Sequence, residues 1–143
     1  RMDAIIAEGA AARVECGQIT RLELRSCTPA PLADQHAEIL ARAVGAPGCR
    51  LAALDLEDNR ITGVGARALA MALSAGARLA ELSFKRNELG DEGAAHIARI
   101  LQGNTALRNL NLAENGLGEA AKDALLDAAY EGPHKSLLEI VNL

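Results

Sequence analysis

The sequence predicts an α/β solenoid, in which each repeat contributes a short strand and a helix. One phrase carries most of this prediction: Leu-x-x-Leu-x-Leu-x-x-Asn-x-Leu, with conservative replacements, begins at Leu51, Leu79 and Leu107, 28 residues apart. Each copy is followed by apolar residues at helical spacing. A fixed period of this length is typical of stacked structural repeats that share one elongated core.

The first half of each repeat is predicted to be a short strand that ends in a turn. Leu54 and Leu56 are separated by one residue, so they point to one face of a strand while Asp55 and Glu57 point to the other. A buried Asn amide in the turn can bond backbone groups of its own repeat and of the next. Stacked copies are expected to form a hydrogen-bonded ladder at Asn59, Asn87 and Asn115.

The second half of each repeat is predicted to be a helix whose apolar stripe faces the strand. Small residues at positions 65, 93 and 121 are expected to let the start of each helix lie close to its neighbour. The stripe is clearest in Gly65, Ala66, Leu69, Ala70 and Leu73, and recurs in Gly93, Ala94, Ile97, Ala98 and Leu101. A looser copy spans 121–129.

The repeats are predicted to occupy residues 19–143, in units of about 19–50, 51–78, 79–106 and 107–137, with a partial unit at 138–143. The first unit has three extra residues near 28–31, and the last connection is three residues longer near 131–133. Residues 1–18 are predicted to form an N-terminal helix, either the tail of a preceding repeat or a cap. Since no polar capping unit is visible at the C-terminal end, we expect a piece of a longer solenoid.

The repeat spacing, the Asn or Cys at the ladder position and the helix phrases GARALAMAL (65–73) and GAAHIARIL (93–101) resemble the ribonuclease-inhibitor-like class of leucine-rich-repeat proteins. The resemblance covers about residues 19–143. It implies a right-handed coil, a horseshoe segment with a parallel β-sheet on its concave side and α-helices on its convex side, which acts most often as a protein-binding surface. Members include ribonuclease inhibitor, innate-immune receptors, activators of Ran-type GTPases, tropomodulin-like actin-capping proteins, ciliary scaffold proteins and bacterial effectors, and the residues single out none of these.

Composition argues against two classes of partner. The formal charge is −4 with acids and bases interspersed, and the chain has one Phe, one Tyr and no Trp. Because neither long-range attraction to phosphates nor stacking platforms are provided, nucleic acid is not an expected partner. No stretch approaches the ~18 apolar residues of a membrane span, and no secretory signal opens the chain. We expect an intracellular location, in the cytoplasm.

No cofactor, metal or catalytic residue is predicted. Cys16, Cys27 and Cys49 lack metal-like spacing, so free thiols in a reducing compartment are expected, with Cys27 as a small buried residue at the ladder position. The three histidines share no ligand spacing. The run Gly63-Val64-Gly65 superficially matches a dinucleotide fingerprint. We interpret it as packing, because the residues equivalent to Gly63 in later repeats are acidic.

The candidate binding surface consists of side chains that period-two alternation directs outward from the strands. Two columns are predicted: Glu23, Asp55, Ser83, Asn111 and Asn142, and beside it Arg25, Glu57, Lys85 and Ala113. Because strands lie ~4.8 Å apart, the second column can pair within itself, so a self-satisfied ladder and a binding surface both remain open. The protein-binding residues we predict are Glu23, Arg25, Asp55, Glu57, Asp58, Lys85, Arg86 and Asn111.

The function we predict is a non-enzymatic protein-interaction scaffold that uses the concave strand face and the adjacent loops. The scarcity of aromatic anchors favours weak or multivalent contact. The alternative is a GTPase activator of the Ran-GTPase-activator type, which stabilises transition-state charge. Arg60 and Arg86, each beside a ladder Asn, are the candidate basic residues for that activity.

Overall fold

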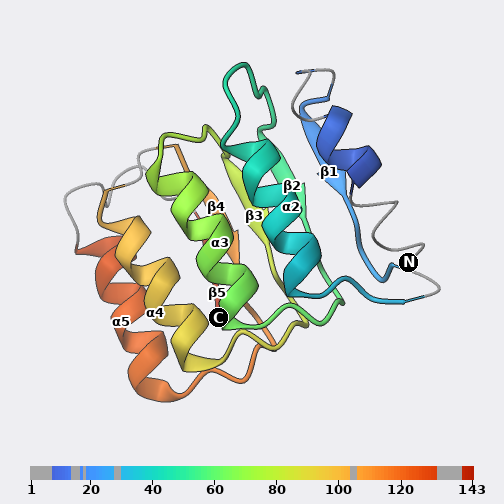
Figure 1. Cartoon of the computed structure of the whole chain (residues 1–143). Coiled ribbons are helices and arrows are strands. Elements are labelled where there is room, and N and C mark those ends of the chain that lie inside the picture. The colour runs from blue at the N-terminus through green and yellow to red at the C-terminus, as the bar shows by residue number, and fades with distance from the viewer. Residues whose placement is uncertain (1–7, 14–16, 18, 28–29, 104–105, 132–139) are drawn as a thin grey trace.

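Strands and helices alternate along the chain in the computed structural model, which describes residues 8–13, 17, 19–27, 30–103, 106–131 and 140–143. One parallel five-stranded sheet contains the strands in chain order. They are β1 (Arg21–Glu23), β2 (Ala53–Asp55), β3 (Glu81–Ser83), β4 (Asn109–Asn111) and β5 (Ile140–Asn142). The helices are α2 (Asp34–Val44), α3 (Gly63–Ser74), α4 (Gly90–Leu101) and α5 (Glu119–Tyr130). The helices lie side by side over one face of the sheet, as Figure 1 shows, which confirms the predicted α/β solenoid.

The sheet register places the same position of every repeat side by side. Arg21 pairs with Ala53, Ala53 with Glu81, and Glu81 with Asn109. The longer first repeat therefore leaves the register of the sheet unchanged. Part of that insertion (28–29), part of the last connection and the start of the final repeat (132–139) lie outside the described residues.

The predicted N-terminal helix is described only at residues 8–13, which are helical. Residues 1–7 lie outside the described part of the chain. Ala11 is buried in the same apolar cluster as the repeats, so this helix covers the first repeat's end of the core.

The core is a stack of aliphatic layers between the sheet and the helices. Leu54, Leu82 and Leu110 are adjacent in the sheet and almost fully buried. A second layer places Phe84 between Leu56 and Leu112, all fully buried. Because each layer contacts only its neighbours, stability is distributed along the stack and depends on every interface.

The predicted ladder of asparagines joins successive repeats through their turns. Asn87 is buried, its Nδ2 donates to Leu56 O at 2.8 Å and to Phe84 O at 2.9 Å, and its Oδ1 accepts from Ile61 N at 2.9 Å. Asn59 and Asn115 make the equivalent bonds. One side chain thus satisfies backbone groups of two repeats, as the sequence predicts.

Close approach of neighbouring helices explains two of the three predicted small residues. A Cβ on Gly65 would lie 2.7 Å from Asp34 Oδ1 and 2.9 Å from Ala37 Cβ on the preceding helix, and one on Gly93 would lie 3.2 Å from Gly63 Cα. A Cβ on Gly63 would lie 3.0 Å from Gly93 N. Packing therefore accounts for the glycines of the dinucleotide-like run.

Asp34 shows how one helix caps the next. Its carboxylate accepts from Thr62 N at 2.8 Å, Thr62 Oγ1 at 2.7 Å and Gly65 N at 3.0 Å, at the start of α3. Asp91 repeats part of this arrangement by accepting from Gly118 N at 2.8 Å. These carboxylates satisfy N–H groups that a helix start leaves unpaired and are favoured there by the helix dipole.

We expect Gly65→Ala to destabilise the protein by up to ~2 kcal/mol. Overpacking costs ~1–3 kcal/mol, and about 1 kcal/mol is regained from the higher helix propensity of Ala. Urea unfolding measures the difference. Gly103→Ala is the control, because a Cβ there meets nothing within 4 Å. Equal stability of the two variants would contradict the close helix approach.

Candidate functional site

The open face of the sheet, on the side opposite the helices, carries three columns of outward side chains, and a rim column follows on the turns. The first column is Arg21, Ala53, Glu81 and Asn109; the second is Glu23, Asp55, Ser83 and Asn111; the third is Arg25, Glu57, Lys85 and Ala113; the rim column is Ser26, Asp58, Arg86 and Glu114. The backbone of Asn142 continues the second column. The two columns that the sequence predicts are therefore in register.

Side chains of the second column stabilise the backbone where the strands end. Asp55 Oδ1 accepts from Glu57 N at 2.9 Å, and Asn111 Oδ1 accepts from Ala113 N at 3.1 Å. Ser83 Oγ accepts from Lys85 N at 3.4 Å in the same way. These are local turns of the Asx and Ser/Thr kind, so the acceptor atoms of this column have a structural role as well as an outward position.

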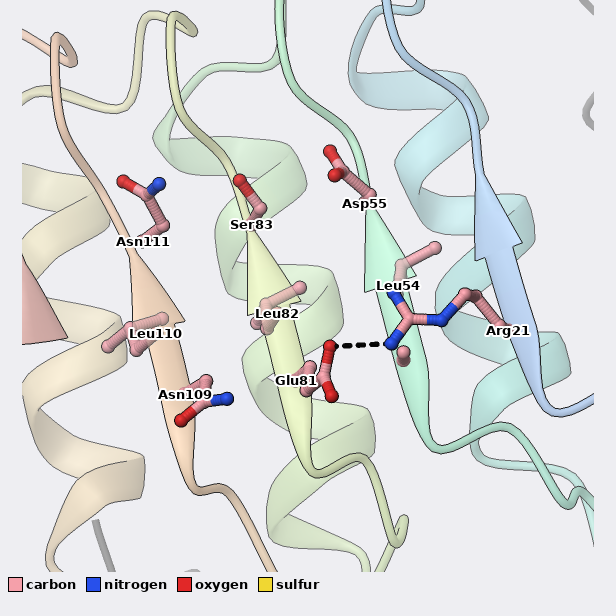
Figure 2. A pocket seen from close by; sticks show the side chains of 10 residues that line it. Arg21, Leu54, Asp55, Glu81, Leu82, Ser83, Asn109, Leu110 and Asn111 are labelled. Atoms are coloured by element: carbon pink, nitrogen blue, oxygen red, sulfur yellow. Dashed lines mark hydrogen bonds and ion pairs between the residues drawn. The ribbon is translucent and has the colours of Figure 1, made fainter. Parts of the chain in front are cut away.

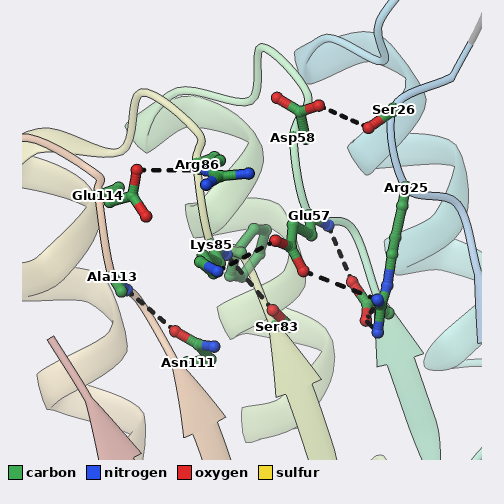
Figure 3. A network of polar contacts seen from close by, with 12 residues as sticks. Arg25, Ser26, Glu57, Asp58, Ser83, Lys85, Arg86, Asn111, Ala113 and Glu114 are labelled. Atoms are coloured by element: carbon green, nitrogen blue, oxygen red, sulfur yellow. Dashed lines mark hydrogen bonds and ion pairs between the residues drawn. The ribbon is translucent and has the colours of Figure 1, made fainter.

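The third column pairs within itself, as the sequence allowed. Lys85 Nζ lies 3.3 Å from Glu57 Oε1, and Arg25 Nη1 lies 3.9 Å from Glu57 Oε2. Arg25 also contacts the second column, since its Nε donates to Asp55 Oδ2 at 2.7 Å. The Asp55 hydrogen bond and charge, with further attraction from Glu57, raise the pKa of Arg25. Figure 3 shows this ion-paired network across β1, β2 and β3.

The rim column sits on turns with left-handed backbone. Its four residues have φ between 44° and 59°, although none of them is glycine. Each precedes the ladder position, where the chain leaves the strand and bends. Ser26 Oγ lies 2.5 Å from Asp58 Oδ2, and Arg86 Nε lies 3.2 Å from Glu114 Oε2 (Figure 3). Asp58 and Arg86, which the sequence grouped with the strand cluster, therefore belong to a separate row on the loops.

The first column was not predicted as part of the surface. Arg21 Nη2 reaches across the small side chain of Ala53 to Glu81 Oε2, at 2.9 Å (Figure 2). Extending the period-two alternation by one residue towards the N-terminus of each strand would have revealed this column. It adds Glu81 and Asn109 to the residues that face outward.

A shallow hollow of about 240 Å³ lies between the first and second columns, centred on β3. Figure 2 looks onto it, with the helices behind the strands. Glu81, Ser83, Asn109 and Asn111 line its β3 and β4 side. Asn109 Oδ1 is buried and has no hydrogen-bond partner, and within the described residues neither Asn109 nor Asn111 uses its Nδ2 in a hydrogen bond. The β3–β4 half of the open face therefore carries uncommitted amide groups, while the β1–β3 half is ion-paired.

Cys27 occupies the ladder position of the first repeat, where it is half-buried instead of fully buried. It lies beside the edge strand β1, and its Sγ donates to Leu24 O at 3.4 Å. Burial raises the pKa of its thiol and so reduces the thiolate fraction that a nucleophile needs. Cys27 and Cys49 are free thiols, and Cys16 lies outside the described residues.

Other chemistry-bearing residues have structural roles. His36 is buried at the start of α2, and its Nδ1 accepts from Ala33 N at 2.9 Å. Within the residues that the structure describes, no group of three or more His, Cys, Asp and Glu side chains is arranged to hold a metal ion. None of the described helices is long and apolar enough to cross a membrane.

Comparisons with known proteins agree with this architecture. The model of the leucine-rich-repeat family matches residues 51–70 and 79–98, the strand and most of the helix in two successive repeats. The chain therefore contains leucine-rich repeats. Among solved structures it is similar to the actin-binding site 2 of leiomodin-1, with a TM-score of 0.79 and 16% identity over 94% of this chain and 76% of that one. No curated protein sequence matches the chain.

Proposed function

We propose that this chain is a non-enzymatic scaffold that binds a protein partner through the open sheet face and the rim column. The uncommitted amides of the β3–β4 hollow carry the proposal. Polar groups that lack protein partners can exchange water for groups of a bound chain at little cost, whereas the ion pairs around Glu57 must first be broken. The contact is therefore centred on Ser83, Asn109 and Asn111, with the charged residues Asp55, Glu57 and Lys85 beside it.

The chemistry of the surface favours a modest affinity. The hollow is lined by short polar side chains, aliphatic residues and the ion pair of Arg21 with Glu81, and no aromatic anchor is among them. Since aromatic and Arg anchors usually dominate binding energy, we expect weak contact that several repeats or several copies strengthen. The similar solved structure is an actin-binding site of leiomodin-1, so monomeric actin is the first candidate partner to test.

Two variants test the surface. Ser83→Arg should fill the hollow and weaken partner binding by about tenfold or more, because the added side chain excludes a bound group from the centre of the site. The double variant Glu57→Lys with Lys85→Glu keeps an ion pair but reverses both charges, and it should weaken binding less. Fluorescence anisotropy with labelled actin measures both, and affinity capture from a cell extract followed by mass spectrometry provides the partner if actin does not bind.

Matched control variants carry the same kinds of substitution on helices, away from the open sheet face. Ala95→Arg adds the same side chain to an exposed position on α4, and Glu119→Lys with Lys122→Glu exchanges an ion pair on α5. Circular dichroism should be the same for all four variants. Binding that is undiminished by Ser83→Arg and by the charge exchange would reject the open sheet face as the site.

The GTPase-activator alternative has no specific observation in its favour. The Arg86 guanidinium is paired with Glu114, whose hydrogen bond and charge raise the pKa of Arg86. Arg60 lies at a hollow beside Asp58. Assignment to the ribonuclease-inhibitor-like class likewise stays a prediction.

A further inference from the structure

A second groove lies on the opposite side of the molecule, between α3 and α4. Two adjoining hollows of about 470 and 530 Å³ share Ser74, Arg99 and Ile100 and so form one continuous depression. It runs from Arg67, along two turns of α3, to Arg78 on the loop that follows this helix. The packing of these two helices is visible in Figure 1, where they lie side by side on the face of the sheet that the helices cover.

The charges of this α3–α4 groove differ from those of the open sheet face. Arg67, Arg78 and Arg99 are exposed, and within the described residues none of them has an ion pair or a side-chain hydrogen bond. On the open sheet face, by contrast, Arg21 and Arg25 contact carboxylates.

No carboxylate lines either hollow among the residues described. The sequence explains why, because the runs 59–80 and 93–113 contain no Asp or Glu. A chain of net charge −4 thus carries a local cationic groove whose charges are not neutralised by its own residues.

The floor of the groove is aliphatic. Ala70, Met71 and Ile100 line it, and the Met71 side chain is 62% exposed. An exposed Met is a flexible apolar contact that adapts to different side chains. The groove therefore combines an apolar strip with guanidinium groups along its length.

We propose that the α3–α4 groove binds an acidic, amphipathic peptide segment of a partner protein. Leu-like side chains of the segment would cover Met71 and Ile100, and its carboxylates would pair with the three arginines, whose planar groups suit carboxylates. A nucleic acid fits less well, because no Phe, Tyr or Trp side chain lines the groove for base stacking. This site is separate from the open sheet face and does not depend on its function.

The probe is a fluorescein-labelled helical peptide with Leu on one face and Glu on the others, measured by fluorescence anisotropy at low salt. We expect the full chain to bind it and to lose about tenfold in affinity when Arg67, Arg78 and Arg99 are all replaced by Gln, since three exposed ion pairs with the peptide are then lost together. Met71→Ser should also weaken binding, by a few fold. Binding should fall as salt is raised.

Three controls make the result specific. Arg42→Gln removes an exposed arginine from the neighbouring helix α2 and should leave binding unchanged. The same peptide with Gln in place of Glu should bind at least several-fold more weakly. The Ser83→Arg variant of the open sheet face should bind the acidic peptide like the wild type, so the two proposed sites are distinguished. Circular dichroism confirms that each variant is folded.

Four outcomes would overturn the proposal. They are no binding of the acidic peptide by the wild type, equal binding by the triple Gln variant, an equal loss with Arg42→Gln, and equally tight binding of a single-stranded oligonucleotide. The exposed face of α5 combines Asp123 and Asp127 with Leu126 and Tyr130, which is the same chemistry as the probe. If the wild type self-associated with rising concentration and the triple Gln variant did not, the occupant of the groove would be a second copy of this chain and not a separate partner.

Discussion

Leu82→Ala is expected to lower the free energy of unfolding by ~2–5 kcal/mol, the largest effect of the substitutions considered. Leu82 is 2% exposed and lies on the central strand β3, between Leu54 and Leu110. Truncation removes apolar contacts and leaves a cavity that two neighbouring repeats share. Because a repeat protein is stabilised by interfaces between neighbours, this one change weakens two of them. Urea unfolding followed by circular dichroism measures the loss.

Leu126→Ala is the matched control for this substitution. Leu126 lies on α5 and is 38% exposed, so its truncation should cost less than about 1 kcal/mol. If Leu82→Ala behaved like the control, Leu82 would not be a core residue and the proposed register of the repeats would be wrong.

Asn87→Ala is expected to cost ~1–3 kcal/mol, chiefly because it leaves one buried donor unpaired. The carbonyls of Leu56 and Phe84 keep the amides of Asn59 and Asn115 as partners, so they remain satisfied without Asn87. Ile61 N has only Asn87 Oδ1 as its acceptor among the described groups, and Ile61 is fully buried. The loss should therefore be concentrated at the junction of two repeats.

Amide hydrogen exchange locates the effect of this variant. The Ile61 N–H should exchange much faster in Asn87→Ala than in the wild type, by more than the global loss of stability explains. Asn111→Ala removes a bond from a half-buried amide on the open face, where water can replace it, and should cost within ~0.5 kcal/mol. Unchanged protection at Ile61 would mean that the ladder does not satisfy this donor.

The candidate surface could be predicted from the sequence in part. Alternation along the strands correctly placed Asp55, Ser83 and Asn111 in one row and Glu57 and Lys85 in the next, because pleating depends only on position in the strand. It did not reveal that Asp55 and Asn111 also close local turns, or that Asp58 and Arg86 sit on left-handed turns beyond the strands. Those features depend on side-chain rotamers and backbone angles, which a residue pattern does not specify.

Which charged side chains form ion pairs with one another was the feature least predictable from the sequence. Arg21 reaches Glu81, 60 residues away in the chain, only because Ala53 between them is small. From the sequence, ion pairing among Arg25, Glu57 and Lys85 and a role of these residues in binding a partner were both possible. The ion pairs engage the charged side chains of the β1–β3 half of the open sheet face. The amide groups of the β3–β4 half have no such partners among the described residues, so we place the proposed contact nearer to Asn109.

The sequence by itself determined the 28-residue period, the order of strand, turn and helix, the leucine layers and the asparagine ladder. Each of these follows from apolar spacing and turn chemistry inside a single repeat. Only the tertiary structure decided which outward charges pair, where the hollow on the open sheet face lies, and that three arginines without an ion pair to any described residue line the α3–α4 groove. These features arise between repeats, where stacking sets the distance between side chains that are 28 or more residues apart in the chain.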